Sequence, residues 1–199
     1  MININKSLAR QWSRLGPRAI YGQSILEFAE ENHKIFAISA DLGNSSGLDR
    51  FKKAYPERYL NIGIAEQNMI GFSSGLSSCS YNVFVSSFAP FLCLRAGEQV
   101  RMNLSYMKSN VKLVAIGSGI SMGFLGNSHF GLEDISIIRS LPNIVIVNPC
   151  DCVEVYKAIE AFSNYTGPAY IRLTGVAGCP VVHNEDYKFE LGKFHILKE

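Results

Sequence analysis

The sequence has no apolar run long enough to cross a membrane, and none that would serve as a secretion signal. A spanning helix needs about 20 apolar residues, and the amino-terminal MININKSLAR has no hydrophobic core. There are 19 basic and 17 acidic residues, which give a formal net charge of +2 without a long basic run. These absences argue against membrane and nucleic-acid partners. We therefore expect a cytoplasmic protein.

Cysteine is also scarce, and its pattern argues against a disulfide framework. The five cysteines are an odd number in a chain of 199 residues, which is long enough to fold without covalent staples, so we expect reduced thiols. One close pair forms a C-x-C, but no second pair completes a tetrahedral zinc site. The sequence therefore predicts no metal site. The cysteines are Cys79, Cys93, Cys150, Cys152 and Cys179.

What the chain does contain is a regular alternation of apolar runs and helix-like segments. With 47% hydrophobic and 18% charged residues, it has the composition of one well-packed domain. Continuous β-branched runs are typical of strands covered on both faces, and their alternation with helices predicts an α/β fold. We expect an open, mainly parallel sheet of about six strands with helices on both faces. The expected strands are 34–41, 58–63, 81–87, 111–117, 143–149 and 168–173, and the expected helices are 17–31, 65–78, 90–106, 133–140 and 151–163.

Four loops follow these strands directly and concentrate the functional candidates. They are DLGNSSG after residue 40, GIAEQ at 63–67, SSFAPF at 86–91 and GSGISMGFLGNSHFG at 117–131. In a parallel sheet the carboxyl ends of the strands lie at one edge, where ligands bind. We therefore expect the functional residues at that edge.

Glu66 lies where an expected strand meets an expected helix. An acid in the first turn interacts favourably with the helix dipole, by about 0.3–1 kcal/mol, which alone would explain it. The helix that follows is rich in glycine and serine, and such thin helices allow close backbone approach. That approach is either inside the core or across a subunit interface.

The loop at 117–131 resembles a phosphate cradle, but its G-x-G-x-x-x-G spacing does not fit a dinucleotide site. His129 lies on this loop, either as a structural hydrogen-bonding residue or as a functional one. Phe88 and Phe91 fall on one side of a turn that enters a helix. They belong either to the core or to the wall of a ligand pocket.

Taken together, the segments ADLGNSSG, GIAEQNM, SSFAPFLCLRAGEQVRMN and GSGISMGFLGNSHFGLED resemble the pyrimidine-binding domain of the transketolase family, in the order found there. The likeness runs from about residue 35 to 172 and is greatest to the small subunit of two-subunit transketolases. It implies that thiamine diphosphate is the cofactor. Glu66 matches the glutamate that hydrogen-bonds N1′ of the aminopyrimidine, and Phe88 and Phe91 match residues that enclose that ring. His129 matches a substrate-contacting histidine, and Asp41 is assigned to the cofactor.

The resemblance implies transfer of a two-carbon unit from a ketose or 2-oxo acid donor to an aldehyde or sugar acceptor. The chain has no Gly-Asp-Gly triplet followed by the asparagine of a diphosphate and Mg²⁺ site. A partner subunit must therefore hold the diphosphate and Mg²⁺, in an expected heterotetramer. We assign residues 1–175 to the pyrimidine-binding domain, and 176–199 to a strap that leads toward a third domain not found in this sequence.

Three positions depart from the family pattern. Leu125 replaces an aspartate four residues before the histidine, Gly175 replaces a phosphate-binding arginine after Thr174, and Leu94 replaces a third aromatic residue. Because the first two changes fall on residues that the family uses to recognise its substrate, we expect a less phosphorylated sugar or a short 2-oxo acid. Two alternatives remain open at this point: the β chain of a 2-oxo acid dehydrogenase first component, and a non-catalytic partner that has kept the fold.

Overall fold

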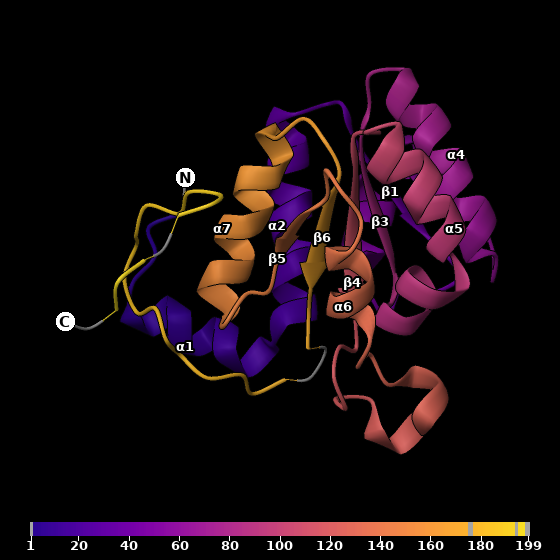
Figure 1. Ribbon diagram of the computed structural model, residues 1–199. Coiled ribbons are helices and arrows are strands. Elements are labelled where there is room, and N and C mark those ends of the chain that lie inside the picture. The colour runs from indigo at the N-terminus through magenta and orange to yellow at the C-terminus, as the bar shows by residue number, and fades with distance from the viewer. Residues whose placement is uncertain (1, 175–176, 194, 198–199) are drawn as a thin grey trace.

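The apolar runs form one parallel sheet, as the sequence predicts. The computed structural model describes residues 2–174, 177–193 and 195–197. Within these residues the sheet has six strands in the order β2-β1-β3-β4-β6-β5, and every pairing is parallel (Figure 1). The strands are β1 (Ile35–Ser39), β2 (Tyr59–Asn61), β3 (Asn82–Phe88), β4 (Val111–Ile116), β5 (Val145–Val147) and β6 (Ala169–Arg172). The two edge strands, β2 and β5, are the short ones.

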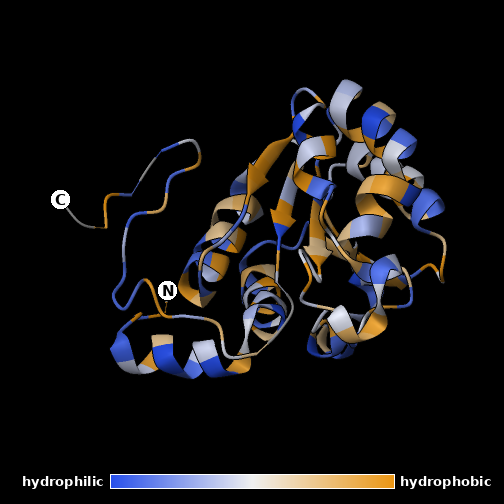
Figure 2. Ribbon diagram, turned by 60° about the horizontal axis from the view of Figure 1, so that its bottom comes forward, coloured by the Kyte–Doolittle hydropathy of each residue, from blue (hydrophilic) through white to orange (hydrophobic). Residues whose placement is uncertain are grey.

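Helices cover both faces of the sheet. One hydrophobic cluster joins the sheet to α1 (Lys6–Leu15), α2 (Pro17–Glu31) and α7 (Cys152–Asn164), with α3 (Asp49–Ala54) packed beside α2. A second cluster joins the other face to α4 (Glu66–Ser78), α6 (Asp134–Arg139) and the helical segment 91–106. Figure 2 shows the strands as mostly hydrophobic elements between these layers. The expected fold is confirmed, and no helix among the described residues has both the length and the apolar character needed to span a bilayer.

The segment 91–106 differs from the single regular helix that the sequence predicts. It consists of a π-helical turn over Phe91–Arg95, an α-helical turn α5 (Gly97–Gln99) and a second π-helical stretch over Val100–Tyr106. The backbone N–H of Ala96 donates to the carbonyl of Phe91, five residues earlier, at 3.1 Å. A π-helical turn closes hydrogen bonds between residues five apart instead of four, and so short a stretch leaves no periodicity that distinguishes it from an ordinary helix.

The carboxyl-terminal segment runs back across the helix layer that contains α1, α2 and α7. Residues 177–193 contain no helix or strand, and Figure 1 shows this part of the chain running past α1 and α7. The backbone N–H groups of Val182 and His183 donate to Oδ2 of Asp151 at 2.9 and 2.7 Å. The division into a domain of residues 1–175 and a strap of 176–199 stays a prediction, and residues 175 and 176 lie outside the described residues.

A lysine is buried on the inner strand β4, near the amino edge of the sheet, and we expect it to give the stability of the fold a specific pH dependence. Lys112, on β4, has no exposed surface, and its Nζ donates to the carbonyl of Gly167 at 2.8 Å and to Oδ1 of Asn110. Burial lowers the pKa of Lys112 to about 7. An unfolded lysine keeps its ordinary pKa of about 10.4, so between these values the unfolded chain binds the extra proton.

Lys112→Met is therefore expected to remove a rise in stability with pH. The free energy of unfolding of the wild-type chain should gain about 2 kcal/mol from Lys112 between pH 7 and 9, because each pH unit in this range contributes up to ~1.4 kcal/mol. Urea unfolding of both proteins at pH 7, 8 and 9 measures the difference, in which other titrating groups cancel. Parallel pH profiles would contradict this assignment.

Candidate functional site

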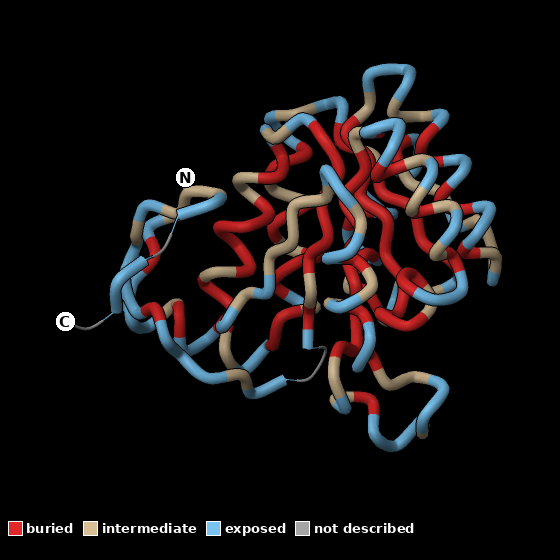
Figure 3. Tube along the Cα trace, viewed as in Figure 1, coloured by how far each residue is buried: buried red, intermediate tan, exposed pale blue. Residues whose placement is uncertain are grey.

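The parallel sheet brings the functional loops to one edge. The loops that follow β1, β2, β3 and β4 all leave the sheet at its carboxyl end, as the strand order requires. The strands themselves are mostly buried, while much of this edge is intermediate or exposed (Figure 3). The residues predicted to be functional therefore lie between a rigid core and the surface.

Glu66 is the first residue of α4, and its side chain is almost completely buried. Only 2% of the residue is exposed. The hydroxyl of Ser87 donates to Oε1 at 3.2 Å, and Nη1 of Arg95 donates to Oε2 at 2.9 Å. A buried carboxylate is costly unless it is paired and hydrogen-bonded, and these two donors supply the compensation. The helix N-terminus also favours the carboxylate, so the dipole and a specific ion pair act together.

Phe88, Phe91 and His129 form a cluster of three rings, which we call the aromatic wall. The ring centroids of Phe88 and Phe91 are 5.7 Å apart, and the imidazole of His129 lies 5.1 Å from Phe88 and 5.3 Å from Phe91. All three pairs are edge-to-face, an arrangement that aromatic quadrupoles favour. The structure therefore brings together three residues that the sequence places on two separate loops.

The aromatic wall rests on a small apolar cluster of its own. Phe88 is 5% exposed and packs with Ile116, Met122 and Leu42. Gly117 lies beneath it with φ +69°, and a Cβ there would lie 2.7 Å from Met122 Cγ and 3.0 Å from Phe88 Cδ1. Only glycine fits this left-handed backbone and this close contact. The position of the Phe88 ring is thus fixed by packing.

Arg95, which the sequence pattern does not single out, joins Glu66 to the aromatic wall. Its guanidinium carbon lies 4.0 Å from the ring centroid of Phe91, within the range of a cation–π interaction, while Nη1 binds the carboxylate of Glu66. About half of the Arg95 side chain remains exposed. An arginine within the apolar run FLCLRA was the available signal. Its direction depends on the π-helical turn, which the sequence pattern does not show.

His129 lies on a loop whose two ends are hydrogen-bonded to each other. The backbone groups of Gly119 and Gly131 exchange two hydrogen bonds, of 2.8 and 2.9 Å, so residues 119–131 form a closed loop. Within it His129 is half-buried, and its Nδ1 lies 3.0 Å from the Ser128 hydroxyl. Leu125, on the same loop, is exposed. The loop therefore presents one imidazole against the phenylalanines and an apolar side chain to solvent.

Asp41 is placed differently from the other candidates. It is exposed, adopts φ +60°, and shares two hydrogen bonds with the side chain of Asn61, of 2.9 and 3.0 Å. These bonds join the loop after β1 to the end of β2. The next residue, Leu42, reaches the apolar cluster under Phe88. Asp41 therefore lies at the same edge of the sheet, with its carboxylate bound to Asn61.

Leu94, another position that departs from the family pattern, and Thr174, which precedes the departing Gly175, lie on the surface of this edge. Leu94 is 53% exposed, beside Arg95, and Thr174 is exposed after β6. Gly175, which follows it, lies outside the described residues. The structure thus places Leu94 and Thr174 where a ligand or another chain has access to them.

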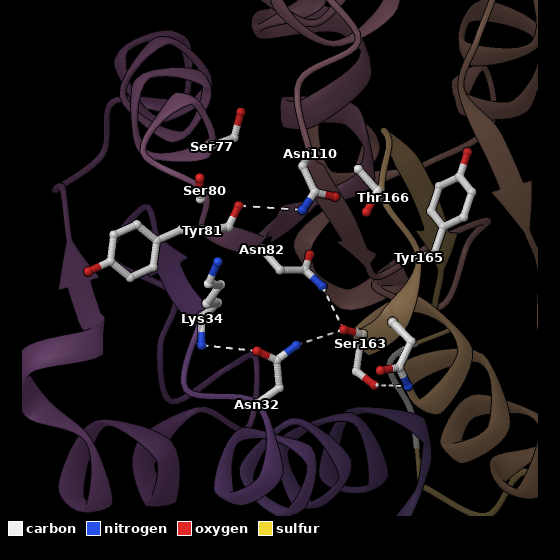
Figure 4. Close-up of a pocket in the computed structure, with 11 residues that line it drawn as sticks. Asn32, Lys34, Ser77, Ser80, Tyr81, Asn82, Asn110, Ser163, Tyr165 and Thr166 are labelled. Carbon is white, nitrogen blue, oxygen red and sulfur yellow. Dashed lines mark hydrogen bonds between the residues drawn. The ribbon is translucent and has the colours of Figure 1, made fainter.

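Two further features lie away from this site. Ligand atoms of Cys150, Asp151 and His183 fall within 4.8 Å of one another, but the Asp151 carboxylate already accepts three backbone N–H bonds, which account for its burial. A polar cavity of about 470 Å³ lies at the amino edge of the sheet, where Asn32, Asn82 and Asn110 line it (Figure 4). It borders the last turn of α4, about 20 Å from Glu66 at the first turn, given the rise of 1.5 Å per residue.

The fold and this edge define an α/β domain in which a buried glutamate at a helix N-terminus lies next to an aromatic wall. Residues 15–176 match the family model "Transketolase, pyrimidine binding domain". The chain therefore belongs to the transketolase family, which confirms the resemblance seen in the sequence.

Relatives that cover most of this chain support the assignment. The chain is 39% identical over 183 residues to a putative transketolase C-terminal section from Methanocaldococcus jannaschii, covering 92% of this chain and 58% of that protein. It is 36% identical to one of the subunits of apulose-4-phosphate transketolase from Phocaeicola vulgatus, covering 90% of this chain and 58% of that protein. A solved structure of a split-gene transketolase, described as an inactive β4 tetramer, superposes with a TM-score of 0.82 at 38% identity and covers 92% of this chain and 59% of the other. The chain thus spans a little over half the length of these relatives.

Proposed function

We propose that this chain is the small subunit of a thiamine diphosphate-dependent transketolase-like enzyme. The enzyme transfers a two-carbon unit from a ketose or 2-oxo acid donor to an aldehyde or sugar acceptor, and is active only with a diphosphate-binding partner subunit. The observation that carries the proposal is the buried carboxylate of Glu66, fixed by two donors and joined through Arg95 to the aromatic wall. We also propose that the enzyme acts in the cytoplasm.

The residues present fit the pyrimidine end of the cofactor. A flat aromatic ring needs an apolar surface, and the edge-to-face rings of the aromatic wall supply one. A ring nitrogen that carries a proton needs an acceptor, and each oxygen of the Glu66 carboxylate keeps a lone pair beyond the one its present donor uses. When bound, the cofactor supplies the carbon nucleophile and the electron sink of the reaction. Mg²⁺ and the diphosphate would be held by the partner.

Each residue of the site then has a defined task. Glu66 accepts the hydrogen bond from N1′ and holds the proton at that atom, with Arg95 and Ser87 keeping its carboxylate in place. Phe88 and Phe91 orient the ring and exclude water from it. His129 stands at the surface of the aromatic wall, where it would contact the substrate. We also propose Asp41 as a cofactor-binding residue. It lies in the loop after β1, and the next residue, Leu42, packs under Phe88.

Exposed apolar side chains extend from this edge along α4 and the segment 91–106, and they support a partner subunit. On and near α4, the segment 91–106 and the loop 119–131, several large hydrophobic side chains are exposed, more than a monomer ordinarily shows in one region. They are Ile64, Phe72, Leu94, Met102, Tyr106, Met107, Ile120 and Phe124. Two helix glycines, Gly71 and Gly75, have no atom within 4 Å of an added Cβ. We propose that this surface is covered in a heterotetramer with two copies of each subunit.

Reconstitution tests the proposal directly. The isolated chain is expected to show no ketol transfer, and mixing it with a diphosphate-binding transketolase subunit, thiamine diphosphate and Mg²⁺ should restore transfer. Failure of every such mixture to bind cofactor or transfer a two-carbon unit would overturn the proposal. Acylation of a lipoyl domain by the mixture would instead identify the β chain of a 2-oxo acid dehydrogenase component.

The donor class is a finer proposal. Leu125 is exposed on the loop of His129, where a typical family member has an aspartate that reads a donor hydroxyl. Gly175 stands in the sequence where the family has a phosphate-binding arginine, so we propose a less phosphorylated sugar or a short 2-oxo acid. Parallel assays with phosphorylated sugars, non-phosphorylated sugars and 2-oxo acids separate the classes. A strict requirement for a phosphorylated pentose would contradict this choice.

Arg95→Met should lower the stability of the folded chain, because it removes a donor to the buried carboxylate of Glu66. The variant leaves the carboxylate of Glu66 buried with one donor fewer, so we expect a loss of about 1–3 kcal/mol in the free energy of unfolding, at the lower end because the arginine is half exposed. Urea unfolding measures this loss. In a Glu66→Gln background the same substitution should cost much less, because no buried charge remains. Equal costs in both backgrounds would show that the ion pair contributes nothing.

A further inference from the structure

Two cysteine sulfurs, far apart in the sequence, lie next to each other at the start of α7. Sγ of Cys152 is 3.0 Å from Sγ of Cys179, and the two residues are 27 positions apart. A disulfide bond is about 2.0 Å long, so a movement of about 1 Å would bring the sulfurs to bonding distance. In the sequence, Cys150 and Cys152 form a C-x-C. The structure shows instead that Cys152 faces the carboxyl-terminal segment.

The backbone around Cys179 is held in place by α1. The N–H groups of Gly178 and Cys179 donate to the carbonyl of Ser13 at 3.0 and 3.2 Å, and the Ser13 hydroxyl donates back to the Cys179 carbonyl. Cys152 is equally fixed, since it is 2% exposed and begins a helix whose N-cap is Asp151. Because both backbones are anchored, the two sulfurs have little freedom to separate.

The two thiols differ in access and reactivity. Burial raises the pKa of the Cys152 thiol, and the neighbouring Cys179 thiol and Asp151 carboxylate act in the same direction. Cys152 is therefore a poor thiolate and is protected from bulk reagents. Cys179 is only half-buried, so an oxidant reaches it first. This combination is that of an accessible thiol beside a buried resolving thiol.

We propose that Cys152 and Cys179 are a redox modification site, at which a small-molecule disulfide or hydroperoxide converts the two thiols into a reversible disulfide. With oxidised glutathione, the thiolate of Cys179 attacks one glutathione sulfur and releases one glutathione thiolate, which takes up a proton. The thiol of Cys152 then gives its proton to water, its sulfur attacks Sγ of Cys179, and the second glutathione leaves. Two protein thiols are oxidised and two molecules of reduced glutathione are formed.

The bond would fasten the carboxyl-terminal segment to the sheet domain. That segment is already attached through Val182, His183 and the ion pair of Asp186 with Lys157 at 2.7 Å. A covalent link at Cys179 would add a constraint close to the point where the chain leaves β6. It would also close the loop of residues 152–179, which stabilises the folded state by restricting the unfolded chain.

The test treats the folded 199-residue chain with oxidised glutathione and maps disulfides by mass spectrometry without reduction. Trypsin leaves Cys150 and Cys152 in one peptide, residues 140–157, so the experiment uses a Cys150→Ser background. We expect a cross-link between peptides 140–157 and 173–188, with a mass lower by two hydrogens than the two free peptides together, and a higher melting temperature that dithiothreitol reverses. Cys179→Ser should lose the cross-link and the change in melting temperature.

A second variant, Cys152→Ser, separates the two steps of the proposed oxidation. Cys152→Ser should accumulate the mixed glutathione disulfide at Cys179, with circular dichroism checking that the chain remains folded. Cys79 is exposed and serves as the control thiol, since the described part of the chain places no second thiol beside it to displace glutathione. If the folded Cys150→Ser chain carried glutathione on Cys179 as stably as on Cys79, the proposal would be wrong. A Cys179 that stayed reduced while Cys79 was modified would overturn it as well.

Discussion

Glu66→Gln should lower ketol transfer by the reconstituted enzyme about 10²–10⁴-fold, the usual contribution of a positioned acid–base group. Glutamine keeps the size of the side chain and an acceptor for Ser87 or Arg95, but it cannot share a proton with a ring nitrogen. Assembly and the folded structure should therefore change little. The measurements are single-turnover transfer rates and cofactor affinity, determined on the same complex.

The matched control for this prediction is Glu98→Gln. Glu98 lies on the segment 91–106 and, like Glu66, pairs with an arginine, here Arg101 at 2.8 Å, but Glu98 is exposed. Its substitution should leave transfer unchanged. A Glu66→Gln complex with normal turnover would show that the ion pair with Arg95 is the whole role of this residue. The non-catalytic alternative would then be favoured.

The sequence was sufficient for those parts of the fold that depend on local pattern. Continuous apolar runs identified all six strands, and the alternation identified α2, α4, α6 and α7 to within about two residues at each end. The meeting of Glu66, Phe88 and His129 at one edge also followed, because parallel strands have their carboxyl ends together. Two helices were not anticipated: α1 and α3, which are short or strongly polar.

The rest of the site depends on geometry that residue spacing does not record. Arg95 lies in the π-helical turn Phe91–Arg95 and binds Glu66, which is 29 positions away, so neither local pattern indicates the contact. Cys179 meets Cys152 because the carboxyl-terminal segment folds back over α1, and nothing near either cysteine in the sequence indicates that path. Contacts between irregular segments that are far apart in the sequence are therefore the part of the structure that the sequence pattern predicts least.

Gly71→Leu is expected to abolish assembly with the partner subunit while the isolated chain folds at least as well as the wild type. Gly71 faces outward on α4, and an added Cβ meets no atom of this chain within 4 Å. Leucine is the better helix former by up to about 1 kcal/mol, so stability of the isolated chain should rise. In the proposed interface, however, a leucine would hold the two backbones apart. Sedimentation of the mixed subunits and urea unfolding of the isolated chain measure the two effects, and Glu30→Leu, exposed on the opposite layer, controls for added hydrophobicity.

Gly22 is the opposite case, a helix glycine that lies against its own chain instead of facing outward. Gly22, on α2, has its own chain pressed against it, since an added Cβ would lie 2.0 Å from the carbonyl oxygen of Gly47. Gly22→Ala should therefore destabilise the isolated chain, although alanine has the higher helix propensity. Sequence alone left both explanations open for the glycines of α4, close approach within the chain or across an interface. Opposite signs for Gly22→Ala and Gly71→Leu in the isolated chain would separate them, whereas a Gly71→Leu chain that assembled normally would remove α4 from the proposed interface.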